Sequence, residues 1–164
     1  MTHDLFLRRK WTLKAHGRQV VFIKNQVEST EHVLMKAFLW ALYLPQYPEA
    51  QVEVRIGDRY KPDIVMLDGM QNRPIFWAEA GHVGQRKIGS LTRRFRNTHF
   101  AMAKWATNLD PYAEMVERAL RKTKRNAPFD LIRFEANSAE KFIAPDGTIN
   151  ITHDNVTWRR LTVK

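Results

Sequence analysis

Two carboxylates stand beside apolar runs in the middle of the chain. Asp63 precedes the run IVML, and Glu79 lies within the run IFWAEA. A carboxylate in such a place destabilises the fold strongly if it is buried without a partner. We therefore expect the pair either to stay in contact with water at a strand end or to share a metal ion. The backbone carbonyl of Ala80 adds another hard oxygen ligand, and such a set suits Mg²⁺ or Mn²⁺.

The segments around these acids predict three successive strands, at 51–57, 62–67 and 74–81, with a hairpin loop at Asp68 and Gly69. Such a meander is antiparallel. Asp63 then begins one strand and Glu79 lies near the end of the next. Antiparallel pairing makes these two ends neighbours, so both carboxylates are expected at one edge of the sheet.

A helix is predicted over 29–44, with Ser29 as its N-cap and Leu34 and Phe38 on its buried face. Glu31 lies three residues before Leu34 on the same stripe, so a third carboxylate is placed to face the sheet and join the metal site. The alternative is that Glu31 only interacts favourably with the helix N-terminus.

The remaining segments predict a hairpin at 5–27 that turns at His16 and Gly17, a helix at 84–95 and a strand at 98–106. A helix with Asp110 as its N-cap and Pro111 at its first position, a strand at 129–135 and short strands at 141–163 follow. The order predicts one mixed α/β domain over residues 1–164. Its central mixed sheet is flanked by helices, with an N-terminal β-hairpin and C-terminal strands added.

The net charge of +10 is concentrated in one part of the chain. Residues 85–125 contain eleven Lys and Arg residues and three acidic residues. A concentrated basic region suits a polyanionic partner such as nucleic acid. The alternative is a solvated basic surface that only keeps the protein soluble.

Composition excludes several classes of protein. The absence of cysteine excludes disulfides, thiolate metal sites and thiol nucleophiles. No apolar run approaches the roughly 18 residues of a membrane span, so no membrane partner is expected. The first residues lack the features of a signal peptide, so we expect a cytoplasmic protein. The sequence also contains no Ser-His-acid set, phosphate-binding loop or zinc-ligand spacing.

The predicted order of helix, three-strand meander, helix and strand resembles the restriction-endonuclease-like core of the PD-(D/E)xK nuclease superfamily. Pro62-Asp63 and Glu79-Ala80-Gly81 match its motif. The stretch VESTEHVLMKAFLWAL, together with PD, FWAEAG and RKI, is similar to the YaeQ family of small bacterial proteins with that core. The resemblance covers residues 27–90. It implies metal-dependent hydrolysis of DNA or RNA, and pairing into a homodimer is common among nucleases of this fold.

The sequence departs from the superfamily motif at one position. The lysine of the motif belongs two residues after Glu79, where this chain has Gly81. Lys87 on the following helix is a candidate to supply that charge, and Gln85 lies on the same helix in line with inward-facing residues. The alternative is that Lys87 is an ordinary surface residue of a basic helix.

Three classes of function remain open. In the first, a metal-dependent nuclease, the ligands are Asp63, Glu79, Glu31 and the Ala80 carbonyl. Lys87 and Gln85 assist, and a set of arginines contacts the nucleic-acid backbone: Arg86, Arg93, Arg94 and Arg96. The second class is a nuclease-fold protein whose catalysis has lapsed and which binds nucleic acid through a basic face, as Gly81 suggests. The third is a basic protein whose partner is another protein.

Overall fold

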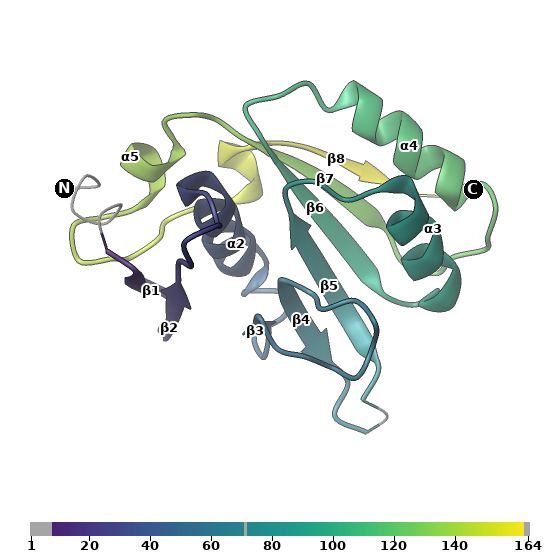
Figure 1. Cartoon of the computed structure of the whole chain (residues 1–164), viewed down its shortest axis with the longest axis horizontal. Coiled ribbons are helices and arrows are strands. Elements are labelled where there is room, and N and C mark those ends of the chain that lie inside the picture. The colour runs from purple at the N-terminus through teal and green to yellow at the C-terminus, as the bar shows by residue number, and fades with distance from the viewer. Residues whose placement is uncertain (1–7, 71, 163–164) are drawn as a thin grey trace.

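The computed structural model describes residues 8–70 and 72–162, and Figure 1 shows the arrangement of the chain. It is a mixed α/β fold with a six-stranded sheet, a separate two-stranded hairpin and helices on both faces of the sheet. The predicted fold class is therefore confirmed. No helix in the described ranges is long and apolar enough to cross a membrane.

The N-terminal hairpin consists of β1 (Lys10–Ala15) and β2 (Arg18–Ile23), paired antiparallel. His16 and Gly17 form its two-residue turn with φ angles of 50° and 76°, as expected of a tight turn that matches the twist of the strands. Trp11, Leu13 and Phe22 on the inner face belong to the buried core that includes α2. The predicted hairpin is confirmed for the part of residues 5–27 that the structure describes, with shorter strands.

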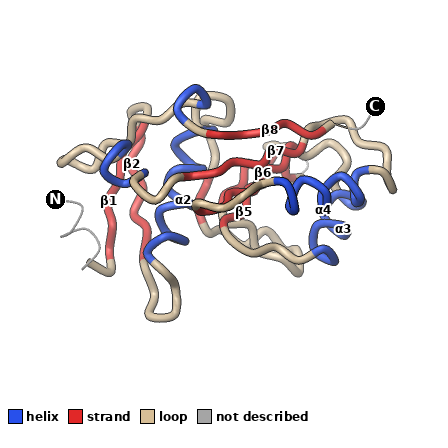
Figure 2. The backbone as a smooth tube through the Cα atoms, turned by 90° about the horizontal axis from the view of Figure 1, so that it is seen from above, coloured by secondary structure: helices blue, strands red, loops and turns tan. Residues whose placement is uncertain are grey.

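Helix α2 (Thr30–Tyr43) lies between this hairpin and the large sheet (Figure 2). The Ser29 hydroxyl accepts a hydrogen bond from the His32 backbone N–H at 3.1 Å, so the predicted N-cap is confirmed. Every residue from Val33 to Tyr43 is buried. A helix that is buried on all sides suits a position between two layers.

The large sheet has the strand order β3-β4-β5-β6-β7-β8. Strands β3, β4 and β5 are antiparallel, β5, β6 and β7 are parallel, and β8 runs antiparallel to β7. The strands are Gln51–Val52, Ile64–Leu67, Pro74–Ala80, His99–Trp105, Phe129–Phe134 and Thr157–Leu161. Helices α3 (Gln85–Arg94) and α4 (Asp110–Leu120) connect the parallel strands and cover the face opposite α2.

The structure corrects three predicted elements. The strand expected at 51–57 ends at Val52, because Glu53 has a φ of 54° and its carboxylate turns to Lys36. Helix α4 begins one residue earlier than predicted, with Leu109 as N-cap. The C-terminal segment forms fewer strands than expected, since it includes a helix α5 (Ser138–Phe142) and a 3-10 turn η1 (His153–Asn155) before β8.

A buried carboxylate joins four elements at the centre of the fold. Asp130 on β7 has no exposed surface and accepts hydrogen bonds from Tyr43 of α2 and His99 of β6, both at 2.6 Å, and from Arg160 of β8 at 2.9 Å. Burial alone would raise the pKa of Asp130. The hydrogen bonds from His99, Arg160 and Tyr43 outweigh it and lower this pKa to about 2. The ionised form of Asp130 is therefore part of the folded state.

We expect Asp130→Asn to destabilise the protein by about 2 to 3 kcal/mol at pH 7, because the substitution removes a charge that the fold stabilises. In wild type this contribution is fully present above the ordinary carboxyl pKa and is lost as the pH falls from about 4 towards 2. Urea unfolding of both proteins between pH 7 and pH 2 measures it. A difference in the free energy of unfolding between the two proteins that stays constant below pH 4 would contradict this account. Glu114→Gln, which changes an exposed carboxylate, serves as the control.

Candidate functional site

The pairing of β4 with β5 brings Asp63 and Glu79 to one edge of the sheet. Ile64 pairs with Ala78, and the Asp63 backbone N–H donates to the Ala78 carbonyl at 3.2 Å, so the pairing extends one residue beyond β4. The Asp63 Oδ2 atom accepts a hydrogen bond from the Ala80 backbone N–H at 2.8 Å. This bond fixes the Asp63 side chain against the end of β5.

Both oxygen atoms of Glu79 have partners within the chain. Oε2 accepts from Trp77 Nε1 at 2.9 Å, and Oε1 accepts from Lys87 Nζ at 2.7 Å. The Lys87 ammonium also lies 5.1 Å from the centre of the Tyr60 ring. Lys87 therefore reaches from α3 to the strand end, and it is a partly buried partner of Glu79 rather than an ordinary surface lysine.

The negative charges of the Asp63 and Glu79 carboxylates repel each other. Burial raises the pKa of Glu79, and the charge of Asp63 raises it further, while Lys87 and Trp77 lower it in part. Burial also raises the pKa of Asp63, against the Ala80 N–H and the charge of His32. Additional positive charge at this edge would stabilise both ionised groups.

Gly81 lies two residues after Glu79, directly beyond the end of β5. Its φ of +87° is in the left-handed region, which disfavours any side chain. A Cβ at this position would contact the His32 ring at 3.4 Å. The Gly81 N–H donates to Ala103 of β6, so the chain here stays paired with the neighbouring strand. The backbone geometry therefore favours glycine.

A second buried lysine lies next to Gly81. Lys104 of β6 donates from Nζ to the Gly81 carbonyl at 2.5 Å, and its ammonium lies 4.0 Å from the centre of the Tyr112 ring. Only 4% of Lys104 is exposed, and burial lowers its pKa to about 8. Lys104 could not be identified as a site residue from the sequence, because nothing in the run HFAMAKWA reveals which residue of β5 it adjoins.

At the start of α2, His32 rather than Glu31 contacts the strand end that carries Asp63. Glu31 is exposed, so the expectation that it faces the sheet is wrong. His32 Nε2 lies 3.1 Å from the Ala80 carbonyl and 3.8 Å from Asp63 Oδ2. On the other side of the ring, Nδ1 lies 2.6 Å from Glu28 Oε2. The spacing of four residues from Glu28 to His32 is the signal in the sequence that could have revealed this contact.

Glu28 continues into a buried ionic network. Its Oε2 atom also pairs with Lys36, and Lys36 pairs with Glu53 just beyond β3. Lys36 is 1% exposed. The chain of contacts from Glu53 through Lys36, Glu28 and His32 therefore ends at Asp63.

The other predicted residues lie on α3 and just beyond it. Gln85 is exposed and lines a pocket with Arg93 and with Lys122, which follows α4, so the expectation that it faces inward is wrong. Arg86 and Arg96 are exposed, as is Arg93.

Arg94 has an anionic partner within the chain. Its guanidinium forms two hydrogen bonds with Asp58, at 2.6 and 3.2 Å, and Nε donates to Ser90 at 3.0 Å. It fixes the loop before β4 to α3. Arg94 is therefore less available for a nucleic-acid phosphate than its exposed neighbours are.

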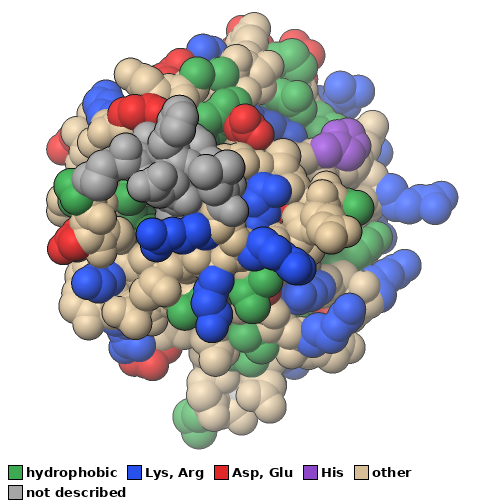
Figure 3. All heavy atoms as spheres, turned by 60° about the vertical axis from the view of Figure 1, so that its left-hand side comes forward, with side chains coloured by type: hydrophobic (Ala, Val, Ile, Leu, Met, Phe, Trp, Pro, Cys, Tyr) green, Lys and Arg blue, Asp and Glu red, His purple; other side chains and the backbone are tan. Residues whose placement is uncertain are grey.

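Basic side chains are not confined to α3 and α4. Figure 3 shows Lys and Arg side chains gathered across the centre and right of one face of the molecule. On the N-terminal hairpin, Lys10, Lys14 and Arg18 are exposed. Exposed basic side chains are thus not limited to residues 85–125.

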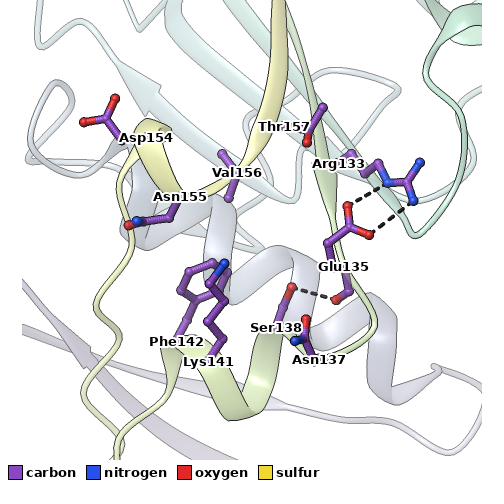
Figure 4. Close-up of a pocket in the computed structure, with 10 residues that line it drawn as sticks. All are labelled: Arg133, Glu135, Asn137, Ser138, Lys141, Phe142, Asp154, Asn155, Val156 and Thr157. Atoms are coloured by element: carbon purple, nitrogen blue, oxygen red, sulfur yellow. Dashed lines mark hydrogen bonds and ion pairs between the residues drawn. The ribbon is translucent and has the colours of Figure 1, made fainter.

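A separate pocket of about 390 Å³ lies between β7, α5 and the start of β8 (Figure 4). Arg133 and Glu135 form an ion pair in its wall, at 2.7 Å, and Phe142 lies at its base. Neither Asp63 nor Glu79 lines it. This pocket is therefore distinct from the carboxylate site.

No three His, Asp or Glu side chains within residues 8–70 and 72–162 converge closely enough, as they stand, to hold a metal ion. The contacts above account for this, because Glu79 is turned towards Lys87 and Trp77 while His32 is held by Glu28. A cation at this edge would need the Ala80 carbonyl as well as side chains.

No protein-family model and no curated protein matches the sequence. Among solved structures, the YaeQ protein from Pseudomonas syringae superposes with a TM-score of 0.61 over 94% of this chain and 95% of its own, at 15% identity. The YaeQ protein from Xanthomonas axonopodis pv. citri has a TM-score of 0.56 over 81% of this chain and 76% of its own, at 12% identity. The chain has the fold of these YaeQ proteins. At these identities the likeness concerns the fold alone, and within the YaeQ fold Asp63 and Glu79 lie at paired strand ends.

We expect Lys87→Ala to raise the pKa of Glu79 further, because the substitution removes the ammonium that opposes burial and the charge of Asp63. A carbon-detected NMR titration of the Glu79 carboxyl measures the change. Arg86→Ala removes a neighbouring exposed cation and should leave the titration unchanged. An unaltered Glu79 titration in Lys87→Ala would show that the ion pair is absent in solution.

Proposed function

We propose that this protein is a divalent-cation-dependent nuclease that hydrolyses phosphodiester bonds in DNA or RNA. One observation carries the proposal. Asp63 and Glu79 lie at the paired ends of β4 and β5, and Lys87 lies 2.7 Å from Glu79 at the same edge. Two carboxylates and one lysine are the groups that bind a metal ion, position water and neutralise phosphate charge.

The donor atoms at this edge suit Mg²⁺ or Mn²⁺. Asp63 uses Oδ2 for the Ala80 N–H, and among the described residues no hydrogen-bond donor contacts its Oδ1. The Ala80 carbonyl and the Glu79 carboxylate add hard oxygen ligands. When bound, the ion would lower the pKa of a coordinated water and stabilise charge on the phosphate oxygens. Glu31 and Gln85 have no part in this proposal, because both are exposed.

Lys87 supplies the positive charge that Gly81 lacks. Its ammonium is held by Glu79 and by the face of the Tyr60 ring, so it is placed before a substrate arrives. In the proposed reaction Lys87 neutralises a phosphate oxygen or orients the attacking water. The exposed residues Arg86, Arg93 and Arg96 bind the flanking nucleic-acid backbone, whereas Arg94 holds the loop before β4 through Asp58.

A nucleic-acid-binding protein whose catalysis has lapsed is the second candidate. Three observations favour it. Gly81 carries no side chain, Glu79 is already neutralised by Lys87, and within the described ranges no three His, Asp or Glu side chains converge on a metal position. In this case Lys87 permanently takes the place of a metal ion.

Calorimetric titration with MgCl₂ and MnCl₂ separates the two candidates. We expect wild type to bind at least one of these ions, and the double substitution Asp63→Asn/Glu79→Gln to weaken the binding at least about tenfold, because it removes two ligand charges. Glu31→Gln serves as the matched control, since it changes an exposed carboxylate. The same proteins are then tested on single- and double-stranded DNA and RNA, and cleavage should be lost together with metal binding.

The absence of binding by wild type in millimolar Mn²⁺ would contradict the nuclease proposal. The second candidate, a nucleic-acid-binding protein without catalysis, then predicts an affinity for nucleic acid that falls steeply as the salt concentration rises. Arg93→Ala should reduce the slope of log K against log salt concentration by about one, since it removes one phosphate contact. Affinity that is independent of salt would exclude both candidates.

A further inference from the structure

The imidazole of His32 lies between two groups of oxygen atoms. Nδ1 is 2.6 Å from Glu28 Oε2, whereas Nε2 is 3.1 Å from the Ala80 carbonyl and 3.8 Å from Asp63 Oδ2. About a third of the His32 side chain is exposed, while the Glu28 side chain is almost fully buried. The ring therefore connects the buried network to the edge of the carboxylate site.

The partners of His32 define what can lie next to Nε2. The Glu28 carboxylate pairs with the Lys36 ammonium through the same oxygen atom, so it is an acceptor and Nδ1 carries the proton. On the opposite side, Nε2 faces two oxygen atoms that are also acceptors. A bare lone pair on Nε2 would be repelled by both oxygens. Either a proton or a metal cation must therefore lie between Nε2 and these atoms.

We propose that His32 Nε2 is the third side-chain ligand of the cation at Asp63, in the position that Glu31 was expected to fill. This inference rests on the proposed metal site and adds a nitrogen ligand to it. The 3.1 Å between Nε2 and the Ala80 carbonyl is close to the separation of about 3.0 Å between adjacent ligands of an octahedral ion with bonds of about 2.1 Å. The longer distance to Asp63 requires that carboxylate to turn slightly towards the ion.

Glu28 acts as a positioning residue for His32. Histidine ligands of metals donate their other ring N–H to a carboxylate or carbonyl, which fixes the tautomer and the orientation of the ring. Glu28 provides such an acceptor, and Lys36 and Glu53 hold Glu28 in place. Burying these charges opposes folding unless their geometry is well satisfied. The network therefore orients a ring whose Nε2 faces the Ala80 carbonyl and, farther away, Asp63.

Gly81 lies beside the His32 ring. A Cβ at position 81 would be in ordinary van der Waals contact with His32 Cδ2, at 3.4 Å, whereas the φ of +87° at this position disfavours any side chain. The strand end therefore carries no motif lysine. The positive charge comes from Lys87 instead, on the other side of the strand end.

A nitrogen ligand changes the preferred metal. Imidazole favours first-row transition metals over Mg²⁺, whereas carboxylates and carbonyls accept both. The site is therefore expected to bind Mn²⁺ more tightly than Mg²⁺. His32→Gln should weaken Mn²⁺ binding by about tenfold or more and bring the two affinities closer together.

Electron spin-echo envelope modulation of the full-length protein with one equivalent of Mn²⁺ tests the ligand directly. We expect a ¹⁴N coupling from imidazole in wild type, replaced by a ¹⁵N coupling when the protein is grown with ¹⁵N-histidine. The coupling should be lost in His32→Gln and kept in His82→Gln, an exposed histidine three residues after Glu79. Glu28→Gln should keep the coupling but weaken Mn²⁺ binding, because the ring is then less well oriented.

The measurement on wild type does not depend on whether a variant folds. Mn²⁺ bound at the Asp63 site without ¹⁴N coupling would overturn this inference and leave the proposed metal site intact. A coupling that disappears in His82→Gln and persists in His32→Gln would show that His82, and not His32, is the ligand, and would overturn this inference. No Mn²⁺ binding at all would overturn both this inference and the proposed function.

Discussion

The antiparallel pairing of β4 with β5 is the constraint on which the candidate site depends. Ile64 pairs with Ala78, so the residues just beyond them, Asp63 and Glu79, must lie at the same edge. A shift of the register by one residue would turn every side chain of β4 to the other face of the sheet. The bond from the Ala80 N–H to Asp63 fixes this register at the point where the carboxylates meet. The core and the site thus depend on the same register.

Nitrogen-bearing side chains reach this edge from three directions. Lys87 comes from α3, His32 from α2 and Lys104 from β6, and each contacts a residue between Glu79 and Gly81. The end of β5 is therefore surrounded by nitrogen groups, although the position after Ala80 carries no side chain. Such an arrangement can support a bound cation and a phosphate. It can equally neutralise the carboxylates by itself, and metal binding distinguishes the two cases.

Much of the fold could be predicted because its elements carry strong local signals. The short apolar runs of β4 and β5, joined by the turn signal at Asp68 and Gly69, predicted the edge at which Asp63 and Glu79 meet. The prediction of a strand over 51–57 was wrong because of a contact between residues far apart in the sequence. Glu53 leaves the strand to pair with Lys36 of α2, and local propensity contains no information about that contact.

The faces of the helices were harder to predict than the helices themselves. Because α2 is buried from Val33 to Tyr43, its apolar pattern does not define a single inward stripe, and Glu31 and His32 could not be distinguished. Gln85 was misplaced because α3 packs against α4 as well as the sheet, so its helix has two covered sides. Lys104 lies beside Gly81 only through the parallel pairing of β5 and β6. A parallel register joins segments far apart in sequence, and no local pattern specifies it.

The central claim is that the paired strand ends hold a divalent cation. The most direct test is anomalous diffraction from crystals of the wild-type protein soaked in MnCl₂. This account predicts an anomalous peak within coordination distance of Asp63, Glu79 and the Ala80 carbonyl, with the Glu79 carboxylate moved from its present contacts towards the ion. Fully occupied manganese sites elsewhere on the molecule, with Glu79 still paired to Lys87 and no peak beside Asp63, would contradict it.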